Sequence, residues 1–227
     1  MSVFQIKGEE HMEVRMTPLI VSTLIVAAGS VTAMADFNGI SYTSETSAYG
    51  VTYQIFVDLD AGDQLNAVYG DSANALSIST DGIFYQNPYG QATVAGMNPA
   101  FFPIFPSLIY DSFVTIGLET NVGNAMLDIG IDFTTFEAGG AIWTDNGSWF
   151  ATPDDEQVNE VNGQVLIGQF TVGVGDTVSG IVNLQGKNAD GSNWTAIGAE
   201  FSAPVIPAPG VLVLVGLAGV VTSRRRK

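Results

Sequence analysis

Apolar and polar side chains alternate along YGVTYQIFVDL, residues 49–59. In a strand, successive side chains point to opposite faces, whereas a helix repeats its apolar positions every three to four residues. Here the apolar residues share one face, and Phe56 is the one large apolar residue on the other. The stretch therefore predicts a half-buried strand. Its inward residues are Tyr49, Val51, Tyr53, Ile55, Val57 and Leu59.

Further strand-sized runs follow, separated by clusters of Gly, Asn and Asp. They are rich in β-branched and aromatic residues, which favour strands. We therefore expect residues 36–203 to form an all-β domain, a two-sheet antiparallel β-sandwich with jelly-roll-like connections. A parallel β-helix is the weaker alternative, because no repeat of fixed length is present. The runs are AMLDIGIDF, GQVLIGQFTVG, TVSGIVNLQGK and NWTAIGAEF.

Three prolines interrupt an aromatic stretch in the middle of the body. Pro99, Pro103 and Pro106 exclude a central strand there, because proline cannot donate to a sheet ladder. We expect a long loop that packs its aromatic side chains over one end of the sandwich. The alternative is an exposed apolar surface that binds a partner.

The body is strongly acidic and contains no cysteine. Between Asp36 and Ile206 the sequence contains 20 acidic residues and one basic residue, Lys187. The whole chain carries a formal charge of −16. Such a surface repels phosphate backbones, so nucleic-acid binding is excluded as a function. The absence of cysteine excludes thiolate catalysis and cysteine-ligated metals.

The amino-terminal segment is typical of a secretion signal. Residues 19–28 form a ten-residue apolar run, and the small residues Ala33 and Ala35 follow at the positions that a signal peptidase reads. We expect cleavage after Ala35, which makes residues 1–35 a signal peptide. The first eleven residues are acidic, so translation starting at Met12 fits a signal better. An uncleaved membrane anchor is the alternative.

The carboxyl-terminal segment combines a short apolar run with a basic end. Residues 211–221 are apolar or glycine, which gives about 17 Å as a helix. This is short for a permanent transmembrane helix. Lysine and arginine stay on the cytoplasmic side of a membrane, so the body would lie outside. Pro207 and Pro209 would leave an extended, accessible segment before the helix.

This segment resembles the PEP-CTERM sorting signal, which has a Pro-Glu-Pro-like motif, a short hydrophobic helix and an arginine-rich end. Ala208 departs from the pattern, since it replaces the acidic residue. The resemblance is confined to residues 204–227. It implies a bacterial exosortase-type processing enzyme as partner, transient anchoring in the inner membrane, and delivery to the cell surface or the extracellular polysaccharide matrix. The signal would comprise Pro207, Ala208, Pro209, Gly210, the helix 211–221, Arg224, Arg225, Arg226 and Lys227.

Catalytic motifs are missing from the body. The single histidine, His11, lies in the leader, so the mature protein has no imidazole base and no Ser-His-Asp triad. Paired carboxylates could serve a glycosidase, but nothing in their spacing identifies a pair. We expect a protein that is not an enzyme.

Two kinds of ligand are suggested by side-chain type. Asp58, Asp60 and Asp63 lie across a strand end and a turn, and carboxylate oxygens are what Ca²⁺ binds. A solvated acidic turn is the alternative, and we expect no other cofactor. Trp143, Trp149 and Trp194 lie near asparagine and aspartate in turn-rich surroundings, so they could stack against sugars. Burial in the core is the alternative for these tryptophans.

Two functional hypotheses follow. The first is a non-catalytic, surface-delivered β-sandwich with a structural or adhesive role associated with exopolysaccharide. The second is a carbohydrate-binding module, supported by calcium in one version. Aromatic side chains exposed on a groove would favour the second hypothesis. Buried aromatics and a featureless acidic exterior would favour the first.

Overall fold

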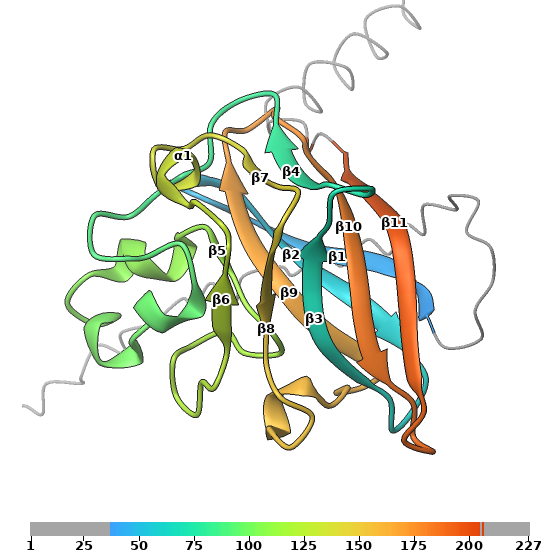
Figure 1. The fold of residues 1–227 in the computed structure, drawn as a ribbon. Helices are drawn as coiled ribbons and strands as arrows, with labels where there is room; N and C mark the ends of the chain where they lie inside the picture. Colours follow the sequence, from blue (N-terminus) through green and yellow to red (C-terminus); the bar gives the residue numbers. More distant parts are fainter. Residues whose placement is uncertain (1–36, 205, 207–227) are drawn as a thin grey trace, which may run out of the picture.

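Two antiparallel sheets packed face to face form the body of the protein (Figure 1). The computed structural model describes residues 37–204 and residue 206. The expected all-β, two-sheet sandwich is confirmed. Among the described residues, no helix is long and apolar enough to cross a membrane.

Sheet A has four strands, and its first two form a hairpin. β2 pairs with β1 on one side and with β9 on the other. The alternation expected for residues 51–59 is confirmed, because every second side chain is buried against sheet B. Tyr49 precedes the strand and is 42% exposed, so the predicted inward face begins at Val51. In spatial order the strands are β1 (Phe37–Ser47), β2 (Gly50–Leu59), β9 (Gln164–Val172) and β5 (Phe113–Val114).

Sheet B has seven strands built around β10 (Val178–Lys187). On one side β10 pairs with β11 (Asn193–Ala203) along its whole length. On its other side β10 pairs with two strands placed end to end. The first half of β10 pairs with β4, and the second half of β10 pairs with β3. Short strands continue the sheet beyond these two. The remaining strands are β3 (Gln64–Gly70), β4 (Leu76–Thr80), β6 (Leu127–Ile129), β7 (Ile142–Thr144) and β8 (Gly147–Phe150).

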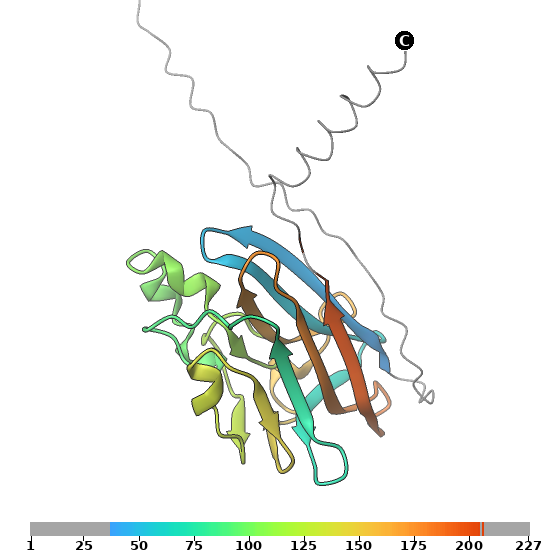
Figure 2. The same cartoon turned by 90° about the horizontal axis from the view of Figure 1, so that it is seen from above.

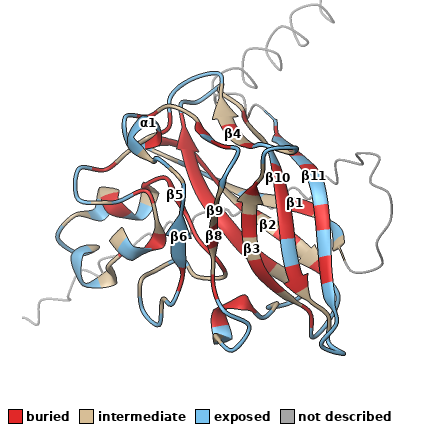
Figure 3. Cartoon of the chain, viewed as in Figure 1, coloured by how far each residue is buried: buried red, intermediate tan, exposed pale blue. Residues whose placement is uncertain are grey.

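The two sheets meet along their long edges. β1 and β11, the edge strands of sheets A and B, lie side by side (Figures 1 and 2). The core fills the space between the inward faces, where the strands alternate between buried and exposed positions (Figure 3). The largest fully buried side chain is Trp149, whose Nε1 donates to the carbonyl of Thr115 at 3.1 Å.

The proline-rich stretch covers one end of the sandwich with three short 3₁₀-helices (green, Figure 1). It both packs and exposes apolar side chains. Val94, Met97 and Leu108 are buried in the core, whereas Phe101 and Ile104 are 45% and 66% exposed. The helices are η1 (Val94–Gly96), η2 (Pro99–Phe101) and η3 (Pro106–Tyr110). Elsewhere, single helical turns occur at α1 (Thr134–Glu137) and η4 (Glu156–Val158).

A buried asparagine holds together the break between β3 and β4. The Asn183 amide donates to the carbonyls of Tyr69 at 3.0 Å and Asn74 at 2.7 Å. Its oxygen accepts from the N–H of Gly198 on β11 at 2.9 Å. Because Asn183 is 1% exposed, these bonds satisfy a buried amide that would otherwise be costly. One side chain thus fixes three neighbouring strands.

Two glycines of β10 make room for aromatic rings of β11. Gly180 lies directly opposite Phe201, and Gly186 lies opposite Trp194. A Cβ added at Gly180 would lie 2.6 Å from the Phe201 ring, and one at Gly186 would lie 2.5 Å from the Trp194 ring. Each ring therefore lies flat over a glycine on the inward face, in the close cross-strand packing that stabilises sheets.

We expect Gly186→Ala to destabilise the protein by about 2 kcal/mol or more, because the added methyl overlaps the Trp194 ring and the Gln64 carbonyl. Urea unfolding measures this change. Thr195→Ala, an exposed position on the same strand, is the matched control and should change stability little. Equal effects of the two substitutions would contradict the packing argument.

Candidate functional site

The outward face of sheet B carries a row of four side chains across four neighbouring strands. Hydrogen-bonded register places Trp143 of β7 opposite Ser77 of β4, Ser77 opposite Ile181 of β10, and Ile181 opposite Glu200 of β11. We call these four residues the Trp143 row. Trp143, at one end, is 59% exposed.

A second row lies two residues further along three of these strands. It consists of Ser79, Ser179 and Ser202, which pair across β4, β10 and β11. We call it the serine row. The intervening residues Ile78 and Phe201 are buried in the core, which shows that the two rows share the outward face.

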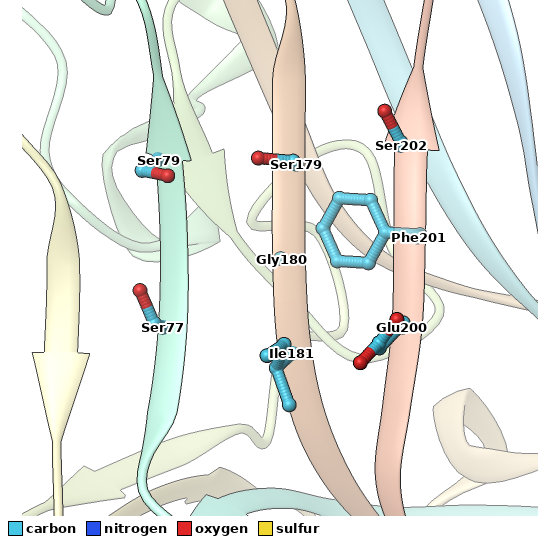
Figure 4. Close-up of a pocket in the computed structure, with 8 residues that line it drawn as sticks. All are labelled: Ser77, Ser79, Ser179, Gly180, Ile181, Glu200, Phe201 and Ser202. Atoms are coloured by element: carbon cyan, nitrogen blue, oxygen red, sulfur yellow. The ribbon is translucent and has the colours of Figure 1, made fainter. Parts of the chain in front are cut away.

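A shallow depression of about 350 Å³ lies between the rows. Gly180 and Phe201 line its floor, and the Phe201 ring lies beside Gly180 (Figure 4). The rim consists of four serine hydroxyls, the Ile181 side chain and the Glu200 carboxylate. The site is therefore an open surface with a polar rim and a small apolar floor.

The hydroxyl groups of this site are not engaged by other side chains. In the described part of the chain, no side-chain hydrogen bond involves the four serines or Glu200, and Figure 4 shows these side chains spread over β4, β10 and β11. Polar groups on the outward face of sheet A behave differently. There, Ser41 donates to the Asp58 carboxylate at 2.7 Å, and Gln164 donates to both residues.

The arrangement matches the chemistry of a carbohydrate. A sugar ring has an apolar face that stacks on an aromatic ring, and its hydroxyls exchange hydrogen bonds with hydroxyl and carboxylate groups. Trp143 supplies the aromatic surface, while the serines and Glu200 supply the polar groups. Among the described residues that line the depression, Glu200 is the one carboxylate, so the lining offers no pair of facing carboxylates of the glycosidase kind.

The other two predicted tryptophans belong to the core. Trp149 is fully buried and Trp194 is 4% exposed, with its Nε1 donating to the Gln64 carbonyl at 3.2 Å. Their rings are not accessible to a sugar. Of the three predicted residues, Trp143 is the one that the structure places at a candidate site.

The three aspartates suggested for calcium do not converge. Asp58 accepts from Ser41 and Gln164, and Asp60 accepts from Asn38 at 2.9 Å. The buried Asp63 accepts from the N–H of Ala189 at 2.8 Å. Within residues 37–204, no three acidic or histidine side chains group to hold a metal. Calcium binding at this turn therefore gains no support from the geometry.

The predicted targeting signals lie outside the described residues. This holds for Ala33 and Ala35 of the cleavage site, and for the whole sorting signal beyond residue 206. The serines, Ile181 and Glu200 were not identified from sequence. Serine at alternate positions in LSIST was a weak signal for an outward face, but strand register, which joins the residues into rows, cannot be read from the chain.

A buried carboxyl group lies away from this face, in the loops over the sandwich end. Asp111 is fully buried, and its Oδ1 accepts from the N–H of Asn87 at 2.7 Å. Its Oδ2 has no hydrogen-bond donor among the described residues. Burial raises the pKa of Asp111 to about 7, against the opposing effect of nearby backbone N–H groups, and Glu137 adds to the rise.

The raised pKa of Asp111 predicts how stability depends on pH. The folded protein holds this proton up to about pH 7, while the unfolded chain releases it near pH 4, so stability falls as the pH rises through that window. The loss is at most about 4 kcal/mol. Urea unfolding between pH 4 and pH 8 measures it, and Asp111→Asn should remove the decline.

Other carboxylates act in a lower window. Hydrogen bonds from Thr177, Thr134 and Ser192 hold the pKa values of Asp81, Asp132 and Asp190 below their usual range. Their contribution is present above about pH 4 and is lost on further acidification. If the free energy of unfolding of Asp111→Asn fell between pH 4 and pH 7 as much as that of the unsubstituted protein, a group other than Asp111 would be responsible for the decline.

No protein-family model, no curated protein and no solved structure matches this chain.

Proposed function

We propose that the chain is an exported, non-catalytic cell-surface or extracellular-matrix protein with a structural or adhesive role associated with exopolysaccharide. Its body is a jelly-roll-like β-sandwich, residues 36–203, between a signal peptide and a sorting segment with a short transmembrane helix. The observation that carries this proposal is the outward face of sheet B, where the exposed Trp143 lies opposite Ser77 on the next strand, and Ser77 and three further serines border a depression.

A second candidate function is that of a carbohydrate-binding module. Exposure of Trp143 beside a depression favours it, since buried aromatic residues throughout would have favoured a purely structural role. The two functions are compatible, because adhesion to a polysaccharide requires a surface that contacts sugars. Calcium is not part of this proposal.

The route outward is supported by the two ends of the chain. The apolar run and small residues before Asp36 favour export, and the PEP-CTERM-like segment favours processing by an exosortase-type enzyme after transient anchoring in the inner membrane. The final location would be the cell surface or the medium. The strongly acidic body supports partners other than nucleic acids.

A non-catalytic role is supported by the residues of the body. It has no histidine and no cysteine, and the raised pKa of Asp111 belongs to a carboxyl group that is fully buried and lies away from the open face. A general acid needs access to its substrate as well as a raised pKa.

Replacing Arg224, Arg225 and Arg226 with serine should trap or mislocalise the protein, because the basic end holds the segment at the membrane. Cell fractionation and intact mass of the protein from the surface and the medium measure this. Replacing Lys187 with serine is the control, since it removes a positive charge outside the signal. Unchanged surface delivery of the triple variant would contradict the sorting proposal.

Trp143→Ala should lower affinity for the producing cell's own polysaccharide by about tenfold, through loss of the stacking surface. Tryptophan fluorescence measures binding, because Trp143 faces solvent while the other two tryptophans are buried. Affinity electrophoresis gives a readout for the variant. Tyr89→Ala, a 56% exposed aromatic at the sandwich end, is the matched control. Retained binding in Trp143→Ala would exclude this face as the contact surface.

A further inference from the structure

We propose that the Trp143 row binds a polysaccharide whose sugars carry free amino groups, lying across the strands from Trp143 to Glu200. This inference rests on the proposed function and names the class of its ligand. It follows from the order of side chains along the row, from its length, and from the sign of the charge around it.

The row alternates between apolar and polar side chains. Trp143 and Ile181, 59% and 43% exposed, are separated by Ser77, and Glu200 ends the row. A linear polysaccharide presents apolar ring faces and polar substituents in turn along its length. Trp143 and Ile181 would each contact a ring face, while Ser77 and Glu200 would bind substituents at the ring edges.

The length of the row suits a short stretch of sugar chain. It crosses four neighbouring strands, and three inter-strand spacings of about 4.8 Å give about 14 Å, roughly the length of three sugars. The serine row runs parallel to it and borders the same depression. Its hydroxyls would therefore contact the second edge of the bound chain.

Charge decides between classes of polysaccharide. Glu200 is exposed, and no hydrogen bond from another described side chain engages its carboxylate. The one basic residue in the described part of the body, Lys187, lies at the far end of β10, six residues beyond Ile181. A uronic-acid polymer would meet this carboxylate and the acidic body without compensation. A protonated amine would instead pair with Glu200.

The experiment compares two short sugar chains that share one backbone and differ in the substituent at the 2-position, a protonated amine in one and a neutral acetamide in the other. The β-1,4-linked hexamer of glucosamine and its fully N-acetylated form have the same backbone, and calorimetry at mildly acidic pH measures their binding to the full-length protein. We expect tighter binding of the free-amine hexamer, weakened by added salt. Glu200→Gln should weaken it about threefold to fivefold, as for an exposed ion pair. Trp143→Ala should weaken it about tenfold.

Two controls separate a specific site from general attraction between a polycation and an acidic protein. Glu45→Gln removes one exposed carboxylate from sheet A and should leave the affinity unchanged. A lysine hexamer with an acetylated amino terminus carries six amino groups, as the glucosamine hexamer does, and its binding should be insensitive to Trp143→Ala. The inference would be overturned if Glu45→Gln and Glu200→Gln lowered the affinity for the glucosamine hexamer equally. It would also be overturned if Trp143→Ala weakened binding of the lysine hexamer as much as binding of the glucosamine hexamer.

The same titrations distinguish this inference from the proposed function. If the N-acetylated hexamer binds as tightly as the free-amine form, and both depend on Trp143, the site binds sugars but does not select amines. That outcome overturns the inference and supports the proposed function. If neither hexamer nor the producing cell's own polysaccharide binds in a Trp143-dependent manner, both fail.

Discussion

Pairing of β10 with its neighbours is the interaction on which sheet B depends. This strand pairs with β11 along its full length on one side and with both β3 and β4 on the other. One long edge strand and two shorter strands are therefore held in register by the same strand. Asn183 lies where β3 ends and closes the break with bonds to both sides. Without that amide, the break would leave buried carbonyls unpaired within the sheet. The rows that make up the candidate site exist because β4 and β11 are held in register by this one strand.

The same alternation produces the core and the open face. At Gly180 the inward side of β10 accepts the Phe201 ring, and at Gly186 it accepts the Trp194 ring. Their neighbours in the chain, Ser179 and Glu200 among them, must then point outward. Gly180 also lines the depression between the rows, whose rim is formed by these outward residues. Core packing and the outward rows therefore depend on the same alternation of β10 and β11.

Alternation along residues 51–59 was enough to predict β2 and its buried face, because an unbroken strand keeps its parity. The tryptophans show where this reasoning ends. Trp143 and Trp149 are six positions apart, so a continuous strand would place them on the same face. The chain turns between β7 and β8, and the parity changes: Trp143 faces solvent, while Trp149 is fully buried. Whether each ring is buried or exposed depends on strand register, and register is set by partner strands that are distant in sequence. The serines of β4, β10 and β11 were missed for the same reason.

The two outward faces differ in how they use polar side chains, and this difference argues for a binding role on sheet B. On sheet A, long polar side chains bond to one another, as where Gln54 donates to Glu119 at 3.2 Å and Gln164 to Asp58 at 2.9 Å. Such a face is sufficient to keep the protein soluble. On sheet B, small hydroxyls surround a depression beside an exposed indole ring. Long charged side chains would cover the ring and fill the depression, while serine leaves both open. The exposed Trp143 ring and the open depression are the features of sheet B on which the proposed binding role depends.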